Sequence, residues 1–365
     1  MRAWFLGAAL VTSCAEPRSA DPPAAPSPPV APAEPPSPAP VEKVEAAETP
    51  PDVGTPPKQP TEPSVLDASA SESTSLGSPT RGRLEGGLAL PLNAPGLLRL
   101  PRKDPESRYG TVELVHALVR AAAKVERETP GAPVSIGDLS RPEGGDISGH
   151  ASHRSGRDVD VLFYLLRDDG EPFVPSKFIP LDPEGRGTDY GDLSDPADDV
   201  PVRIDIPRTW RFVAALLAED AAVQRILIVE HLRSALLAEA KRQGTAKDIV
   251  QRFAEVTCQP RFPHDDHMHI RVFCSAEDVR AGCEDPKPRF PWRIAELEAA
   301  GVEMLAPGEG TAMDTEVATP KKKPKLKTIE QARAEAGPMH EDVVDFLDRR
   351  QAWARKPHPG RRWCR

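Results

Sequence analysis

The chain has 365 residues, of which 43 are Pro and only 18 are aromatic, and its net charge is −9 because 56 Asp and Glu outnumber 47 Lys and Arg. A single folded domain cannot account for a chain so rich in Pro and so poor in aromatic residues. The net negative charge argues against a nucleic-acid partner, since binding to phosphates requires an excess of positive charge.

The first 14 residues are typical of an export signal. Arg2 precedes the apolar run 3–11, which is far shorter than the roughly 20 residues that a membrane span needs. Residues 11–14 (VTSC) resemble a bacterial lipobox, in which a Cys that follows small residues is lipidated and becomes the new N-terminus. We therefore expect lipidation at Cys14, with a plain secretory signal as the alternative.

A Pro-rich stretch follows this signal. Between Asp21 and Pro60, 15 of 40 residues are Pro and none is aromatic, so the stretch cannot bury enough apolar surface to offset its chain entropy. We predict a disordered spacer over residues 15–84, a folded domain over 85–305, and a basic linker with a C-terminal helical extension over 306–365.

The folded part predicts a mixture of helices and strands, and hence an α+β fold. Apolar residues recur at helical spacing after a Thr111 cap. Helices are predicted at 112–128, 210–218, 231–242, from a Thr245 cap to about Val256, and at 329–354 in the extension. Strands are predicted at 134–139, 158–166, 225–229 and 267–273. The acidic segment 167–201, rich in Gly and Pro, is predicted to be a long surface loop.

The number of cysteines agrees with export from the cytoplasm. Four remain once Cys14 is set aside, an even number that allows two disulfides in an oxidising compartment. Cys274 and Cys283 flank one short polar segment and form the favoured pair, which leaves Cys258 to reach Cys364. Four unpaired thiols are the alternative. None of the four has CxxC spacing, so a cysteine zinc site is disfavoured.

Five of the nine His fall in two short windows, 148–160 (SGHASHRSGRDVD) and 264–269 (HDDHMH). Within them His153, Asp160 and His269 supply two imidazoles and one carboxylate, a set that binds catalytic zinc and leaves a position open for water. Alternate residues of a strand share one face. One of the two His on the predicted strand at 267–273 can then bind metal while its neighbour handles protons.

These windows, together with Arg108-Tyr109, the IGD sequence at 136–138 and the segment from Cys274 to Asp285, resemble the penicillin-insensitive murein endopeptidases. That family belongs to a group of zinc metallopeptidases that includes lysostaphin-type peptidases, D-alanyl-D-alanine carboxypeptidases and the hedgehog fold. The string G-H-A-S-H-x-x-G-x-D-V-D carries most of the resemblance. We expect a small antiparallel sheet with flanking helices to carry the zinc site.

By position, the resemblance implies a set of zinc ligands, a catalytic His and further pocket residues. The ligands are His153, Asp160 and His269, the catalytic residue is His267, and His150 and His264 occupy pocket positions. His150 and His264 have an alternative as structural histidines or residues that orient the ligands. Asp158 is expected to hydrogen-bond nearby loop groups, with a role at the metal as the alternative.

The resemblance also implies a reaction: hydrolysis, by metal-activated water, of the amide between D-alanine and meso-diaminopimelate in cross-linked peptidoglycan. The alternatives are a D,D- or L,D-carboxypeptidase of the same group and a non-catalytic module that binds peptidoglycan. A lipid on Cys14 would anchor the domain to the outer membrane, in the periplasm, while the spacer lets it reach the peptidoglycan layer. An inert leader on a freely soluble periplasmic protein is the alternative to this tether.

Overall fold

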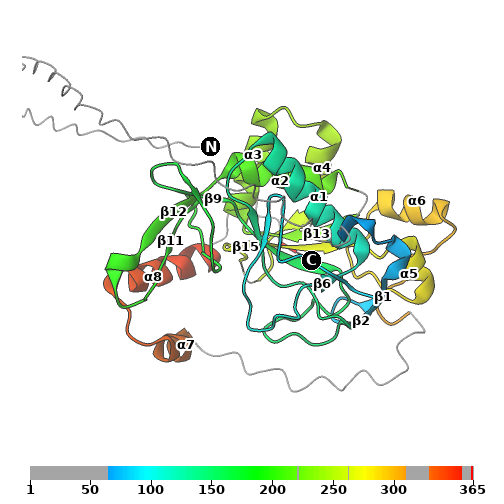
Figure 1. The fold of residues 1–365 in the computed structure, drawn as a ribbon, viewed down its shortest axis with the longest axis horizontal. Coiled ribbons are helices and arrows are strands. Elements are labelled where there is room, and N and C mark those ends of the chain that lie inside the picture. Colours follow the sequence, from blue (N-terminus) through cyan, green and yellow to red (C-terminus); the bar gives the residue numbers. More distant parts are fainter. Residues whose placement is uncertain (1–64, 220–221, 262, 310–328, 356–362, 365) are drawn as a thin grey trace, which may run out of the picture. The chain divides into compact units, whose positions relative to one another are not determined.

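The computed structural model describes residues 65–219, 222–261, 263–309, 329–355 and 363–364 (Figure 1). The predicted signal peptide, the lipidation site at Cys14, most of the spacer and most of the basic linker lie outside these residues. In the part of the chain that is described, every helix is too short or too polar to cross a membrane.

The predicted α+β class is confirmed. The α-helices of the described residues are α1 (Val112–Glu128), α2 (Ile206–Leu217), α3 (Glu230–Arg242), α4 (Lys247–Val256), α5 (Ala276–Ala281), α6 (Pro291–Ala299), α7 (Ile329–Ala336) and α8 (Glu341–Arg355). The strands are β1 (Thr74–Ser78), β2 (Arg81–Glu85), β3 (Leu88–Ala89), β4 (Asn93–Ala94), β5 (Leu97–Arg99), β6 (Tyr109–Gly110), β7 (Val134–Ile136), β8 (Asp158–Leu162), β9 (Leu165–Arg167), β10 (Pro172–Phe173), β11 (Arg186–Asp189), β12 (Val200–Ile204), β13 (Val223–Leu227), β14 (Thr257–Cys258) and β15 (His267–Val272).

A seven-stranded sheet with the order β14-β13-β15-β8-β7-β5-β4 carries the two motif strands, β8 and β15. Its centre, from β13 to β7, is antiparallel, whereas β14 pairs with β13 and β5 pairs with β7 in parallel. The sheet is therefore larger than expected and mixed towards its edges. Helices α1 to α4 contact one another and lie together above it in Figure 1.

Helix α1 has the bounds that its sequence predicts. The Thr111 hydroxyl accepts a hydrogen bond from the Leu114 amide at 3.4 Å and caps the helix. Leu114, Val115 and Leu118, which recur at helical spacing, are fully buried in the core. The apolar face of α1 thus packs against the sheet and α2.

Two other helices begin at different residues than expected. Helix α2 begins before the predicted range 210–218, because the Asp205 side chain accepts from the Arg208 amide and caps an earlier turn. Helix α4 has no side-chain cap, so the predicted Thr245 cap is wrong. The Thr245 hydroxyl instead accepts a hydrogen bond from Trp210 Nε1 at 2.8 Å and ties α2 to the start of α4.

The segment 167–201 is not a surface loop as predicted. It supplies β10, β11 and the start of β12, which form a four-stranded antiparallel sheet with the order β10-β9-β12-β11. Val202 and Ile204 alternate inward along β12 and are buried. The predicted strand 158–166 is split accordingly, since β8 joins the large sheet and β9 joins this smaller one.

The folded domain begins earlier than residue 85. Strand β1 pairs with β2 inside the range assigned to the spacer, and the side chains of Leu76 and Leu84 are buried there. The hydroxyl of Ser73 accepts from the Val112 amide at the start of α1. Strands this short lack a strong periodic signal, and the polar composition around them suggested a linker.

Within the described residues 329–355, the C-terminal extension forms two helices instead of the one predicted for 329–354. Helices α7 and α8 are separated at Gly337, whose φ of 87° is left-handed and favours glycine. Pro338 follows it and limits helix continuation through the missing amide donor.

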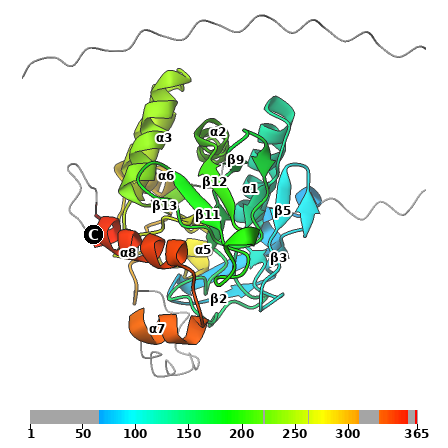
Figure 2. The same cartoon turned by 90° about the vertical axis from the view of Figure 1, so that its left-hand side faces the viewer.

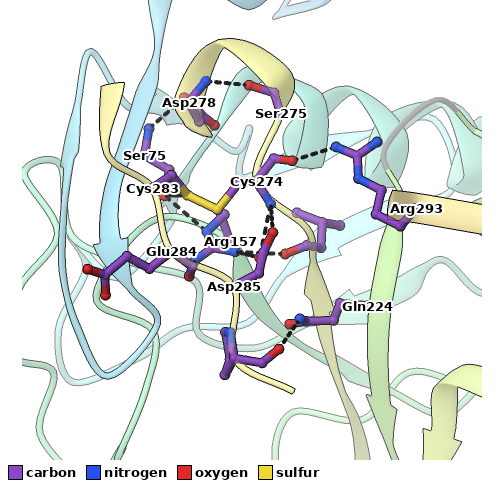
Figure 3. Close-up of a disulfide and its surroundings, with 12 residues drawn as sticks. Ser75, Arg157, Gln224, Cys274, Ser275, Asp278, Cys283, Glu284, Asp285 and Arg293 are labelled. Atoms are coloured by element: carbon purple, nitrogen blue, oxygen red, sulfur yellow. Dashed lines mark hydrogen bonds and ion pairs between the residues drawn. A yellow bond between two sulfur atoms is a disulfide. The ribbon is translucent and has the colours of Figure 1, made fainter. Parts of the chain in front are cut away.

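Both predicted disulfides are confirmed, which excludes four unpaired thiols. Cys274–Cys283 and Cys258–Cys364 have Cα separations of 5.9 and 5.0 Å. Beside the first of them, Arg157 points into a fully buried cluster and forms an ion pair with Asp285 at 2.7 Å (Figure 3). This cluster joins the start of β8 to the end of β15.

Candidate metal centre

The pairing of β15 with β8 brings the two sequence windows together. The register places His269 opposite Asp160, and Arg271 opposite Asp158. Residues directly opposite each other in an antiparallel pair have Cβ atoms about 4.5–5.5 Å apart. Because side chains alternate along a strand, the acids of β8 share one face with His267 and His269 of β15.

Three donor atoms converge on this face. His153 Nε2 lies 3.2 Å from His269 Nδ1, and Asp160 Oδ1 lies 3.2 Å from His269 Nδ1 and 3.4 Å from His153 Nε2. The three residues are nearly or fully buried, with exposed fractions of 0 % for His153, 2 % for Asp160 and 6 % for His269. The structure therefore brings the three predicted ligands into one triangle.

The hydrogen bonds of the other two ring nitrogens determine whether the nitrogens in the triangle carry protons or lone pairs. His153 Nδ1 donates to the Leu139 carbonyl at 2.9 Å, and His269 Nε2 donates to Asp158 Oδ1 at 2.9 Å. In the neutral imidazoles, the nitrogens in the triangle consequently carry lone pairs. Two lone pairs and a carboxylate oxygen this close repel one another unless a proton or a metal ion lies between them.

A tetrahedral metal ion fits this donor set. Bonds of about 2.0–2.1 Å to nitrogen or carboxylate oxygen place tetrahedral ligands about 3.3–3.4 Å apart, which matches the sides of the triangle. Two imidazoles and one carboxylate also leave a fourth position for water or substrate. His153, Asp160 and His269 are thus able to hold a metal ion.

Asp158 binds both histidines of the triangle, His269 through its ring and His153 through its main-chain amide. Besides the bond from His269, its carboxylate accepts from the His153 amide at 3.1 Å and from Arg271 Nε at 2.6 Å. Although burial raises the pKa of Asp158, Arg271 and His269 hold it well below its usual range. The ionised carboxylate fixes the tautomer of His269 and the backbone of His153. That backbone has a left-handed φ of 67°, which few non-glycine residues adopt.

His267 lies beside the triangle. Its Nε2 atom is 3.5 Å from Asp160 Oδ1, and its Nδ1 donates to Asp266 Oδ1 at 2.6 Å. Burial lowers the pKa of His267, but the carboxylates of Asp160 and Asp266 outweigh it and raise the pKa to about 10. The side chain is 17 % exposed, so it can exchange protons with a bound molecule.

His150 lies near the second carboxylate oxygen of Asp160. Its Nε2 donates to Asp138 Oδ2 at 3.1 Å, and its Nδ1 is 3.8 Å from Asp160 Oδ2. His150, His153 and Asp160 also offer donor atoms within 4.8 Å of one another. The set that includes His269 is tighter, with separations of 3.2–3.4 Å.

Asp138 and Asp266 are site residues that the sequence reasoning did not assign. Asp138 accepts two bonds from Arg102 and one of 2.6 Å from Ser107. Burial raises the pKa of Asp138, but the bonds from His150, Arg102 and Ser107 hold it well below its usual range. Its sequence signals are its place within the predicted strand 134–139 and in the IGD sequence at 136–138.

His264 lies near the triangle but farther from it. Its ring centroid is 4.7 Å from that of His267 and 6.0 Å from that of His269. Its φ of 52° is left-handed, and its carbonyl accepts from the Val229 amide at 3.1 Å. The structure thus gathers all the site residues of the two windows around Asp160.

Comparison with known proteins identifies the part of the chain that carries this site. Residues 75–291 match the profile of a family described as penicillin-insensitive murein endopeptidase. A protein of that name from Klebsiella pneumoniae subsp. pneumoniae is 31 % identical over 236 residues, which cover 62 % of this chain and 75 % of the relative. One from Pectobacterium atrosepticum is 30 % identical and covers 60 % of this chain and 71 % of the relative. One from Escherichia coli is 29 % identical and covers 58 % and 69 %.

Proposed function

The chain belongs to the penicillin-insensitive murein endopeptidase family, and from this premise we propose that it is a zinc-dependent enzyme that hydrolyses D-alanyl–meso-diaminopimelate cross-links in peptidoglycan. The observation that carries the zinc assignment is the triangle of lone pairs formed by His153, Asp160 and His269. The names of the relatives support murein as the substrate.

The residues of the triangle would hold the ion, and the surrounding carboxylates keep them in place. When bound, zinc acidifies a water molecule and polarises the scissile carbonyl group. Asp158 keeps His269 in the tautomer that presents its lone pair and holds the backbone of His153, whose own tautomer is set by the Leu139 carbonyl. Asp138 keeps the His150 ring against Asp160.

His267 is the residue that we assign to proton transfer. Its bond to Asp266 points Nε2 towards the reacting groups, within 3.5 Å of a ligand oxygen. A cationic imidazole there stabilises negative charge on the carbonyl oxygen and gives a proton to the leaving amine. The four cysteines outside the signal are paired in disulfides, so none of them offers a thiolate nucleophile.

Digestion of purified murein sacculi tests the reaction. We expect the protein to convert cross-linked muropeptide dimers into monomers, identified by mass spectrometry, and we expect a chelator to stop this and added zinc to restore it. Asp160→Ala should lose both zinc and activity, because it removes the carboxylate of the triangle. Loss of terminal D-alanine alone would identify a carboxypeptidase, and binding without cleavage would identify a non-catalytic module.

We also propose that the protein is lipidated at Cys14 and works in the periplasm from the outer membrane. The lipobox-like sequence at residues 11–14 supports this. The two disulfides agree with it, since such bonds persist in oxidising compartments.

A further inference from the structure

The C-terminal helices lie outside the part of the chain that matches the family, which ends at residue 291. Helix α8 nevertheless packs on the domain, beside β11 in Figures 1 and 2. The His340 amide donates to the Leu193 carbonyl at 2.8 Å, and the rings of His340 and Phe346 contact Tyr190. Val343 and Phe346 are buried at this contact.

Arg350 of α8 binds the segment that precedes the proton-transfer residue. Its Nε donates to Asp265 Oδ2 at 2.9 Å and its Nη2 donates to Asp265 Oδ1 at 2.6 Å, a two-point contact. The side chain of Asp265 is fully buried, with 0 % exposed. Trp353 Nε1 adds a longer bond of 3.4 Å to the same carboxylate.

The same guanidinium reaches the next carboxylate. Arg350 Nη2 lies 3.8 Å from Asp266 Oδ2, and Asp266 Oδ1 in turn accepts from His267 Nδ1 at 2.6 Å. The Asp265 carbonyl accepts from the Leu181 amide at 2.8 Å and fixes the other side of this turn. One residue of the extension therefore contacts both acids that precede His267.

The extension is also fastened beyond α8. Cys364 forms the disulfide with Cys258, and its amide donates to the Gln259 carbonyl at 3.0 Å. Contacts at His340 before Arg350 and at Cys364 after it hold the chain on both sides of the Asp265 contact. A covalent anchor so close to the motif segment keeps the guanidinium at high effective concentration there.

We propose that Arg350 is a positioning residue for the hydrolysis proposed above: it fixes Asp265 and Asp266 so that Asp266 orients His267. This inference rests on the proposed function, and it makes the C-terminal extension part of the active site. A carboxylate held at two points has one orientation, which a single contact would not define.

The test compares Arg350→Ala with Arg349→Ala in the full-length protein. Arg349 is the adjacent residue on α8, and its exposed guanidinium lies over the Phe346 ring instead of at Asp265. Purified cross-linked muropeptide dimers serve as substrate. We expect Arg350→Ala to lower kcat about 10- to 100-fold, because a displacement of roughly 1 Å can cost about 100-fold. KM and zinc content should stay near wild type, and Arg349→Ala should resemble wild type throughout.

Two further measurements separate positioning from a general loss of structure. Arg350→Lys keeps the charge but cannot make two parallel bonds, so it should recover only part of kcat. Hydrogen exchange followed by mass spectrometry should show faster exchange at residues 264–267 in Arg350→Ala and unchanged exchange in α1.

The inference is wrong if Arg350→Ala keeps the wild-type kcat. It is also wrong if kcat falls only together with zinc content and exchange protection across the whole domain. If the wild-type protein does not cleave the dimers, the proposed function fails instead. The exchange comparison at residues 264–267 then decides by itself whether Arg350 fixes this segment.

Discussion

A single oxygen of Asp160 lies within 3.5 Å of ring nitrogens from three histidines, His153, His267 and His269. Burial raises the pKa of Asp160, but His153 and His267 hold it well below its usual range. The three rings nevertheless differ in what binds their far nitrogen: a backbone carbonyl for His153, Asp266 for His267 and Asp158 for His269. We propose that His153 and His269 hold the metal ion, whereas His267, paired with Asp266, transfers protons.

The first prediction separates the two histidines of β15. His267→Ala should keep its zinc and lose about 100- to 10,000-fold in kcat, the range typical of a proton-transfer residue. His269→Ala should lose zinc, since it removes a corner of the triangle. Metal analysis and turnover measured on both variants check this. Equal loss of zinc in the two variants would show that the assignment of roles is wrong.

The second prediction concerns pH. Asp266 helps raise the pKa of His267 to about 10, so Asp266→Asn should lower that pKa. The imidazolium is present below its pKa and is lost as the pH rises through it. The alkaline limb of the kcat profile should therefore move to lower pH in the variant. Both profiles are measured with zinc bound, because the ion offsets part of the Asp160 charge equally in both. Asp169→Asn, in an exposed turn, is the control and should leave the limb in place.

At the scale of elements, alternation along β15 was enough to predict that His267 and His269 share a face. The sequence does not determine the pairing of His269 with Asp160, because the register between strands 109 residues apart depends on the whole sheet. The contact between Arg350 and Asp265 could not be predicted either, because the two residues are 85 apart in the sequence and meet only once α8 packs on the domain. Strands β1 and β2 were missed because short strands carry little periodic signal.

The third prediction tests the buried cluster of Arg157 and Asp285, which joins the start of β8 to the end of β15. Arg157 donates to Ser75, Asp285 and two backbone carbonyls, and the side chains of Arg157 and Asp285 are both 0 % exposed (Figure 3). Removing one partner of a buried pair leaves an unpaired charge and costs about 3–5 kcal/mol. Arg157→Met should lower the free energy of unfolding by about that amount in denaturant titrations.

An exposed ion pair provides the control for that measurement. Arg83 pairs with Glu85 at 2.8 Å with side chains 46 % and 57 % exposed. Such pairs contribute about 0–1 kcal/mol, so Arg83→Ala should change stability little. A loss of less than about 1 kcal/mol in Arg157→Met would show that the cluster is not a major source of stability.

At the scale of the whole molecule, the proposed active site and the proposed location in the cell depend on different parts of the chain. Every side chain of the metal centre lies between residues 138 and 269, and the Arg350 contact that we propose for it lies in α8. The lipobox-like sequence and the Pro-rich stretch precede Val65, where the described residues begin. Changes to the leader should therefore affect where the enzyme works and leave its chemistry intact.

The last prediction follows from the length of this leader. The 50 residues between Cys14 and Val65 span about 40 Å as a flexible coil and about 155 Å as extended polyproline II. A lipid on Cys14 would then hold the domain at the membrane while the spacer sets how far into the peptidoglycan it reaches. Cys14→Ser should move the protein to the soluble fraction without changing hydrolysis of isolated sacculi.

Deleting residues 21–60 should leave that hydrolysis unchanged and reduce cross-link cleavage only in cells, because the shortened chain reaches less of the peptidoglycan. A scrambled spacer of the same length and composition is the matched control, and it should behave as wild type if reach alone matters. Muropeptide analysis of whole cells and fractionation of each variant measure both effects. A wild-type protein that is already soluble and carries no lipid mass would refute the tether and leave the metal assignment untouched.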